Sequence, residues 1–168
     1  MARPFLAVST TLLFALVAAQ TQLQAAQRST PEDRAKVVSI ARFLETDPLG
    51  PQAPEQRQWV IRWLIEVPDI HVKACNMVGP VMGSKKNYGT EIFAQMLASS
   101  AAVIVENPNK ADDEIAVYTA SLDGALRAYE SILKAKPKAK WPFLDGLIEK
   151  RAKGELPAYV REAATHCK

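Results

Sequence analysis

The sequence predicts an all-α protein, an irregular bundle of about five to six helices held by one disulfide. Three observations lead to this fold class. Apolar residues recur at intervals of three and four along several segments, which is the period of an amphipathic helix. Prolines and glycines separate those segments, and no pair of runs has the alternation and turn that a β-hairpin requires. Because each apolar stripe has to be buried against another, the helices are expected to pack together.

The first two helices are expected over residues 31–45 and 54–67. Thr30 is a suitable N-cap, and Pro31 is tolerated at the first helical position. A proline- and glycine-containing break at residues 47–51 separates the two helices. The second helix ends before Pro68, and its apolar stripe consists of Trp59, Val60, Trp63, Leu64 and Val67. Two tryptophans four residues apart are first of all core residues, but they could also line an aromatic pocket.

Residues 68–89 are expected to form a long irregular connection, because glycines, a proline and Asn87 interrupt any helical pattern there. Connections of this length are uncommon in compact domains. They are often functional, or they contain a short element that the sequence does not reveal. This segment is therefore the first place to look for a binding surface.

Four further helices are expected downstream. Thr90 is expected to cap the third helix, in which the small residues 98–102 favour close approach by another helix. The acids at residues 112–114 begin a fourth helix that closes around Pro137. A fifth opens at Trp141-Pro142 and stops at Gly154, since glycine is a common C-terminal residue of helices. The last begins at Pro157 and ends just before Cys167.

The N-terminus is predicted to be a secretory signal peptide over residues 1–19, with one basic residue and then an apolar run. The run is shorter than the about 20 apolar residues that span a bilayer, and polar residues follow it directly. Cleavage is expected after Ala19, and small residues ending at Ala26 offer a second zone. Residues 20–30 are then a flexible N-terminal segment, and residues 31–168 form a single helical domain.

Export places the mature chain in the periplasm or outside the cell, as a soluble protein without a membrane span. Cys75 and Cys167 are the only cysteines in the chain, so one intramolecular disulfide is expected. Closing a loop of that length would stabilise the fold by about 4 kcal/mol in the chain-entropy model.

The charge of the chain is nearly balanced, with 21 basic and 18 acidic residues, but basic residues concentrate in the C-terminal third. Lysines in the last turns of helices complement the helix dipole, so a solvated and well-capped surface is the first interpretation. Nucleic acid is not an expected partner, because the protein is exported and the lysine run lacks interleaved aromatic residues.

Catalytic motifs are almost absent from the sequence. Ser131 and Lys134 match the bare Ser-x-x-Lys pattern of penicillin-recognising enzymes, but its companion motifs are missing and the pattern falls at the end of a predicted helix. An enzyme without a recognisable motif remains one alternative, and no cofactor is expected.

A metal site is the second alternative. His71 and His166 each lie close to a cysteine, so the disulfide would bring the two histidines near one link, where they could bind copper or zinc. Met77 and Met82 could add thioether ligands for Cu(I), although methionine also fills gaps beneath loops. Disulfide formation competes with metal binding, because it consumes the thiolates.

The favoured function is a non-enzymatic binding or interaction module outside the cytoplasm, of unknown partner and oligomeric state. Its partner is expected to be a protein or a small apolar ligand. The binding surface is expected on the 68–89 segment and the adjacent tryptophan helix, and its candidate residues are Trp59, Trp63, Met77, Met82 and Tyr88.

Overall fold

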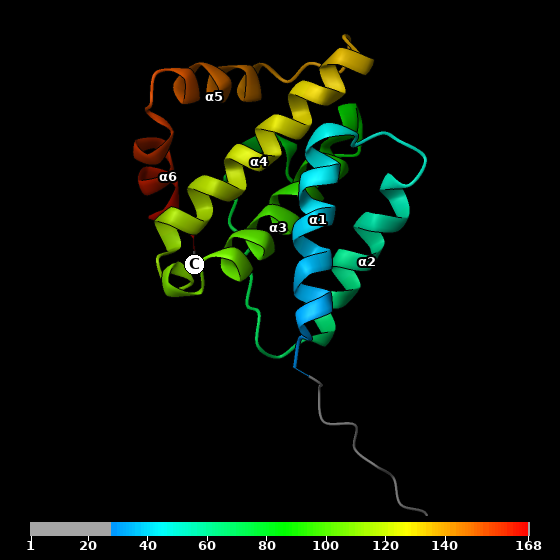
Figure 1. The fold of residues 1–168 in the computed structure, drawn as a ribbon. Helices are drawn as coiled ribbons and strands as arrows, with labels where there is room; N and C mark the ends of the chain where they lie inside the picture. Colours follow the sequence, from blue (N-terminus) through cyan, green and yellow to red (C-terminus); the bar gives the residue numbers. More distant parts are fainter. Residues whose placement is uncertain (1–27, 168) are drawn as a thin grey trace, which may run out of the picture.

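A computed structural model describes residues 28–167, and these residues form six α-helices and no β-strand (Figure 1). The predicted all-α fold is therefore confirmed. The predicted signal peptide, residues 1–19, and most of the predicted flexible segment, residues 20–30, lie outside the described residues. Three short 3₁₀ turns, Gly79–Val81, Lys86–Tyr88 and Pro108–Lys110, lie between helices. The helices are α1 Pro31–Thr46, α2 Ala53–Glu66, α3 Gly89–Glu106, α4 Glu114–Ala135, α5 Pro142–Ala152 and α6 Leu156–Ala164.

Helices α3 and α4 form the centre of the bundle (Figure 1). Helices α1 and α2 pack on α3, α1 also contacts α4, and α5 and α6 pack on α4. Among the described helices, the stretch Lys86–Glu106 is long and apolar enough to cross a membrane, with a mean hydropathy of 1.2, but 56% of it is buried inside the fold. The central position of α3 accounts for this composition, because a helix surrounded by other helices is apolar on most of its faces.

The two central helices approach closely because the residues at their contact are small. A Cβ atom on Gly124 of α4 would lie 2.0 Å from Ser99 Oγ and 2.7 Å from Ser99 Cβ of α3. The hydroxyl of Ser100 donates to that of Ser121 at 2.6 Å, and Ser121 donates in turn to the carbonyl of Val117 at 2.5 Å. The close approach predicted from the small residues 98–102 is confirmed.

Most of the predicted helix ends are confirmed. The Thr30 hydroxyl accepts the Asp33 amide at 3.1 Å, the Asp113 carboxylate accepts the Ala116 amide at 3.0 Å, and Gly154 after α5 has φ +73°.

The prediction that Thr90 caps the third helix is wrong. Helix α3 starts at Gly89 without a side-chain cap, after Tyr88 in the left-handed region. Gly89 is required at this start, because a Cβ there would lie 2.5 Å from the Ser84 carbonyl oxygen.

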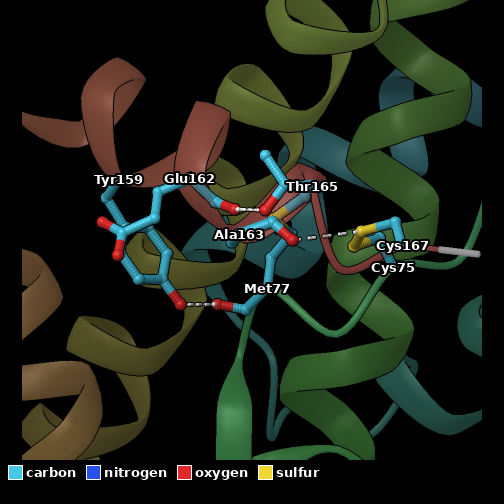
Figure 2. Close-up of a disulfide and its surroundings, with 7 residues drawn as sticks. All are labelled: Cys75, Met77, Tyr159, Glu162, Ala163, Thr165 and Cys167. Carbon is cyan, nitrogen blue, oxygen red and sulfur yellow. Dashed lines mark hydrogen bonds between the residues drawn. A yellow bond between two sulfur atoms is a disulfide. The ribbon is translucent and has the colours of Figure 1, made fainter.

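The predicted disulfide joins Cys75, in the connection before α3, to Cys167, just beyond α6 (Figure 2). Their Cα atoms are 5.5 Å apart and 92 positions separate them in the chain. The hydroxyl of Tyr159 on α6 donates to the Met77 carbonyl at 2.9 Å, so the connection is bound to α6 at two points. A crosslink that closes such a loop stabilises the fold by about 4 kcal/mol in the chain-entropy model.

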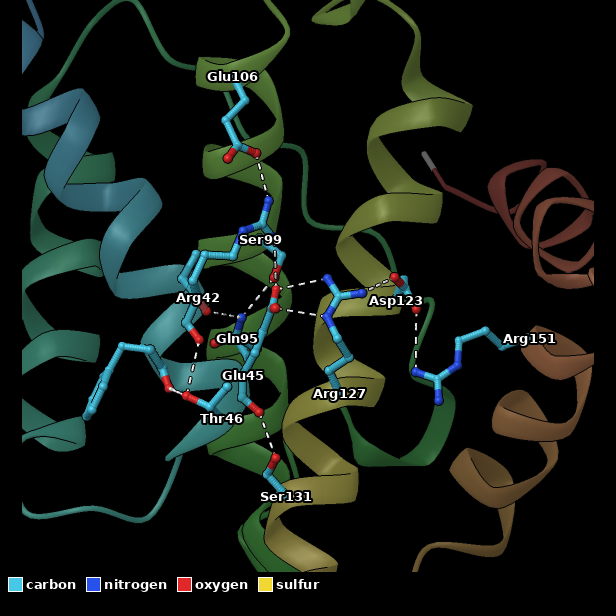
Figure 3. A network of polar contacts seen from close by, with 12 residues as sticks. Arg42, Glu45, Thr46, Gln95, Ser99, Glu106, Asp123, Arg127, Ser131 and Arg151 are labelled. Carbon is cyan, nitrogen blue, oxygen red and sulfur yellow. Dashed lines mark hydrogen bonds and ion pairs between the residues drawn. The ribbon is translucent and has the colours of Figure 1, made fainter.

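A buried carboxylate, that of Glu45 in the last turn of α1, connects three helices (Figure 3). Only 7% of Glu45 is exposed, and it accepts two hydrogen bonds from Arg127 of α4, at 2.8 and 3.0 Å, and one from Arg42 at 3.0 Å. These bonds raise the pKa of Arg127. Arg127 also pairs with Asp123, which in turn contacts Arg151 of α5 at 3.4 Å. The network fixes α1, α4 and α5 relative to one another, because a buried carboxylate is stable only when its oxygens are satisfied.

A second polar cluster holds the N-terminus of α1 against the end of α2. The Asp69 carboxylate accepts the Ser29 amide and the Ser29 hydroxyl, both at 2.9 Å, and pairs with Arg34 at 2.9 Å. The hydrogen bond from the Ser29 amide, followed by those from the Ser29 hydroxyl and Arg34, lowers the pKa of Asp69 to about 2.

The contact at Gly124 leads to a prediction about stability. Gly124→Ala should destabilise the fold by about 1–3 kcal/mol, because its methyl group would overlap Ser99 in a packed interior. Gly146→Ala in α5 is the matched control. No atom lies within 4 Å of its added Cβ, so helix propensity alone should stabilise the protein by about 0.5–1 kcal/mol. Urea unfolding of both variants measures the difference, and equal effects would contradict a tight α3–α4 contact.

The cluster at Asp69 leads to a prediction about pH. An unfolded chain protonates Asp69 near pH 3.8, whereas the folded protein does so only near pH 2, so the stabilisation is complete above about pH 4 and lost as the pH falls toward about 2. Asp69→Asn should therefore cost about 1 kcal/mol at pH 7, with the partial exposure of the pair discounted, and only a small fraction of that near pH 2. Chemical unfolding across this pH range tests the prediction, with Asp112→Asn on an exposed carboxylate as control. A pH-independent difference would refute it.

Candidate functional site: a groove between α2, the connection and α3

The connection, residues 67–88, joins α2 to α3 and supplies part of every predicted site. It contains two short 3₁₀ turns, which agrees with the expectation that such a connection is either functional or contains a short element. Part of the connection is buried. Ile70 packs with the core around α1 and α2, whereas Met77 packs with the core around α4, α5 and α6. The connection thus crosses the molecule from one core cluster to the other.

The two tryptophans of α2 stack on each other, with ring centroids 5.8 Å apart and planes inclined by 13°. Trp63 is buried, with 5% of its surface exposed, and Trp59 is half-buried with the Lys36 ammonium 4.2 Å from its ring centroid. Trp63 therefore serves the core, and Trp59 lies between the core and the surface.

The remaining predicted partner residues also differ in how far they are buried. Met77 is fully buried, Tyr88 is half-buried, and Met82 is 38% exposed at the turn after Val81. A partner at the surface of this structure could contact Met82, Tyr88 and Trp59, but not Met77. Trp63 is almost fully buried, and its remaining surface lines a hollow of about 210 Å³.

An apolar groove runs between α2, the connection and α3. It consists of two adjoining hollows of about 440 and 210 Å³ that share Ile61 and Ile65. Ile65 is 79% exposed, the largest exposure of any large hydrophobic side chain among the described residues. The other residues that line this groove, called the α2–α3 groove below, are Arg57, Gln58, Arg62, Leu64, Val72, Ala74, Thr90, Ala94 and Leu97.

Positive charge borders one end of the α2–α3 groove. Arg57 donates to the Pro48 carbonyl at 2.8 Å, and burial lowers its pKa while the nearby Glu91 carboxylate raises it. Arg62 is exposed and forms no ion pair with any residue that the structure describes. The groove thus combines an apolar floor with an unpaired guanidinium at its edge, a combination that suits an apolar segment carrying an acidic residue.

A separate cavity of about 350 Å³ lies beneath the connection near the start of α4. His71, Lys73, Asp112, Glu114 and Tyr118 contribute its polar groups, and Lys73 pairs with Glu114. The hydrogen bond to Glu114 raises the pKa of Lys73, and burial raises the pKa of Tyr118. Both pKa values are therefore moved further from neutral pH. Because a general acid or base needs a pKa near the working pH, Lys73 and Tyr118 do not indicate acid–base chemistry.

The two histidines lie in different elements, His71 in the connection and His166 in the turn after α6. His71 is exposed beside the cavity just described, and His166 is exposed in the turn after α6. The cysteines that would complete a zinc site form the disulfide. Within residues 28–167, no group of three or more His, Cys, Asp or Glu side chains is arranged to hold a metal ion.

Another hollow, of about 580 Å³, lies between α4 and the segment that joins α5 to α6. It contains none of the residues predicted as a site. Of its three charged residues, Asp123 and Arg151 already pair with each other, and Asp113 caps α4 by accepting the Ala116 amide. Arg151 also pairs with Glu130 at 2.5 Å. The charges of Asp123 and Arg151 are engaged in the network around Glu45 and leave little for a ligand to bind.

None of the five partner residues predicted from the sequence lines the α2–α3 groove, and Ile61 and Ile65, which the two hollows share, were not predicted. Both isoleucines lie off the apolar stripe that faces the core, and they are four residues apart on α2, so they share one face. Two large apolar residues outside the core stripe were the signal for a second apolar surface on this helix.

Comparisons of the chain with protein-family models, curated proteins and solved structures found no match. The geometry of the described residues therefore carries the functional argument.

Proposed function

We propose that this protein is an exported, non-enzymatic binding module that captures a partner protein through the α2–α3 groove. The observation that carries the proposal is the exposure of Ile65, 79%, directly above an apolar groove that Ile61 shares. Burying such a side chain contributes about 1.5–3 kcal/mol, so leaving it in water is unfavourable unless a partner covers it.

The groove favours an amphipathic helix as the partner segment. Its two adjoining hollows, which share Ile61 and Ile65, offer places for more than one apolar anchor, as helix-in-groove complexes require. Arg62 at the edge would pair with an acidic residue next to those anchors. Opposite charges across an interface increase the association rate of the two proteins and disfavour partner segments that carry a basic residue at this position.

The other functions considered have less support. Copper or zinc handling by His71 and His166 would lack Met77, which is fully buried, and the described residues offer no third ligand of the usual kinds. Acid–base catalysis would need groups whose pKa values are shifted toward neutral pH. In the cavity beside His71, the pKa values of Lys73 and Tyr118 are both raised, which moves them away from neutral pH.

The groove can be tested by photo-crosslinking in the producing cell. A photoreactive amino acid at Ile65 should form an adduct with one polypeptide, and the same amino acid at the exposed Lys153 should not. A synthetic peptide of the crosslinked segment should be apolar with an acidic residue. It should bind Ile65→Ser or Arg62→Glu at least about tenfold more weakly than the unmodified protein.

The stability of these variants provides the control. Both substitutions are at exposed positions and should change the free energy of unfolding by less than about 0.5 kcal/mol. Equal adducts at both positions, or a peptide that binds Ile65→Ser with unchanged affinity, would refute the groove as the partner site.

Export is the second part of the proposal. The apolar run of residues 1–19 and the disulfide both support an oxidising compartment outside the cytoplasm. The mass of the protein recovered from the exported fraction should correspond to a chain that begins at Gln20, or to one cleaved after Ala26. Both thiols should react with an alkylating agent only after reduction. An intact N-terminus or freely reactive thiols would contradict export with an oxidised pair.

A further inference from the structure

The end of α4 and the start of α3 lie at the same end of the bundle (Figure 1). Six exposed lysines belong to these two segments. Two of them precede α3, and four lie in the last turn of α4 and the linker to α5. This set, called the lysine face below, consists of Lys85, Lys86, Lys134, Lys136, Lys138 and Lys140. In the sequence the two groups are about 50 positions apart, so only the fold joins them.

Hydrogen bonds fix the two groups to each other. The Asn87 side-chain amide donates to the Lys140 carbonyl at 3.0 Å, and the Trp141 indole donates to the Asn87 carbonyl at 3.0 Å. Gly79 lies against the Phe143 ring, where a Cβ would be 2.7 Å from Cζ. The backbone beneath the lysine face is therefore fixed before any partner arrives, which reduces the entropy lost on binding.

Within the part of the chain that the structure describes, none of the six lysines forms an ion pair. Asp145, in the first turn of α5, accepts a hydrogen bond from the Tyr129 hydroxyl at 2.8 Å and is already engaged. Six like charges without counterions create a strong local positive potential, which attracts an extended anionic surface.

Apolar and aromatic side chains accompany these lysines. Met82, at the turn beside Gly79, is 38% exposed, and Trp141 and Tyr88 are half-buried. A soluble polyanion needs only positive charge, whereas a protein on a bilayer surface also places apolar and aromatic groups at the headgroup level.

We propose that the lysine face docks the protein on a bilayer surface rich in anionic phospholipid. The ammonium groups would contact headgroup phosphates, and Met82 and the edge of Trp141 would enter the interface. Each lysine near such a surface strengthens binding by up to about fivefold, and the attraction decays over about 10 Å at 0.1 M salt, so attachment is peripheral and reversible. This inference does not depend on the α2–α3 groove.

Sedimentation with lipid vesicles tests the inference on the mature, oxidised protein. It should bind vesicles of about one-third phosphatidylglycerol in phosphatidylcholine, but not phosphatidylcholine alone, and binding should weaken as salt is raised. Replacing Lys85, Lys86, Lys138 and Lys140 with glutamine should weaken binding at least about 20-fold. The matched control neutralises four exposed basic residues elsewhere, Lys110, Lys150, Lys153 and Arg161, and should change binding less than about threefold.

Two further measurements separate the alternatives. Met82→Ser should weaken vesicle binding but not binding to inorganic polyphosphate in solution. If both four-residue variants lost vesicle binding equally, net charge alone would account for the binding. If the protein bound polyphosphate more tightly than vesicles, its ligand would be a soluble polyanion. Either result would overturn the proposal. Ile65→Ser should bind vesicles normally, so failure of the groove proposal and failure of this one are distinguishable.

Discussion

The close contact between α3 and α4 is the constraint on which the rest of the bundle depends. With a glycine facing Ser99 and two serine hydroxyls joined beside it, the central helices leave no room for larger side chains. The outer helices then pack on a pair whose separation is fixed. The Glu45 carboxylate, which reaches Arg127 on α4 from the end of α1, adds a polar contact that is satisfied only at this spacing. Apolar packing and the polar network thus specify the same arrangement.

The path of the connection determines one wall of the α2–α3 groove. Ile70 is buried with the core of α1 and α2, and five residues later Cys75 is bonded to the end of α6 on the other side of the bundle. A chain of five residues spans at most about 18 Å, so it must cross the molecule nearly directly. On this path Val72 and Ala74 line the same hollow as Ile61 and Ile65. The disulfide that secures the C-terminus therefore also fixes the position of one wall of the α2–α3 groove.

Local patterns predicted the helices well, because apolar period, caps and breaks are properties of neighbouring residues. Thr30, Asp113 and Gly154 acted as expected. The contacts between distant segments were not readable in the same way: Glu45 and Arg127 are 82 positions apart, and nothing local to either predicts the other. Thr90 does not cap α3, because the helix already begins at Gly89. Only glycine allows this start, since a Cβ at position 89 would overlap the Ser84 carbonyl oxygen. The sequence did not predict the residues of the candidate groove: Ile61 and Ile65 lie off the core stripe of α2, and only the fold brings Val72 and Ala74 of the connection beside them.

The two proposed surfaces meet at the start of α3, and this has a consequence for how they would act together. Thr90 and Ala94 line the α2–α3 groove, and the Thr90 hydroxyl donates to the Ser84 carbonyl, next to Lys85 of the lysine face. A partner in the groove would therefore lie close to a bilayer bound at the lysine face. Because both sites are cationic, an acidic partner segment and anionic headgroups would repel each other across this short distance. Binding at one surface would weaken binding at the other, by the same factor in both directions.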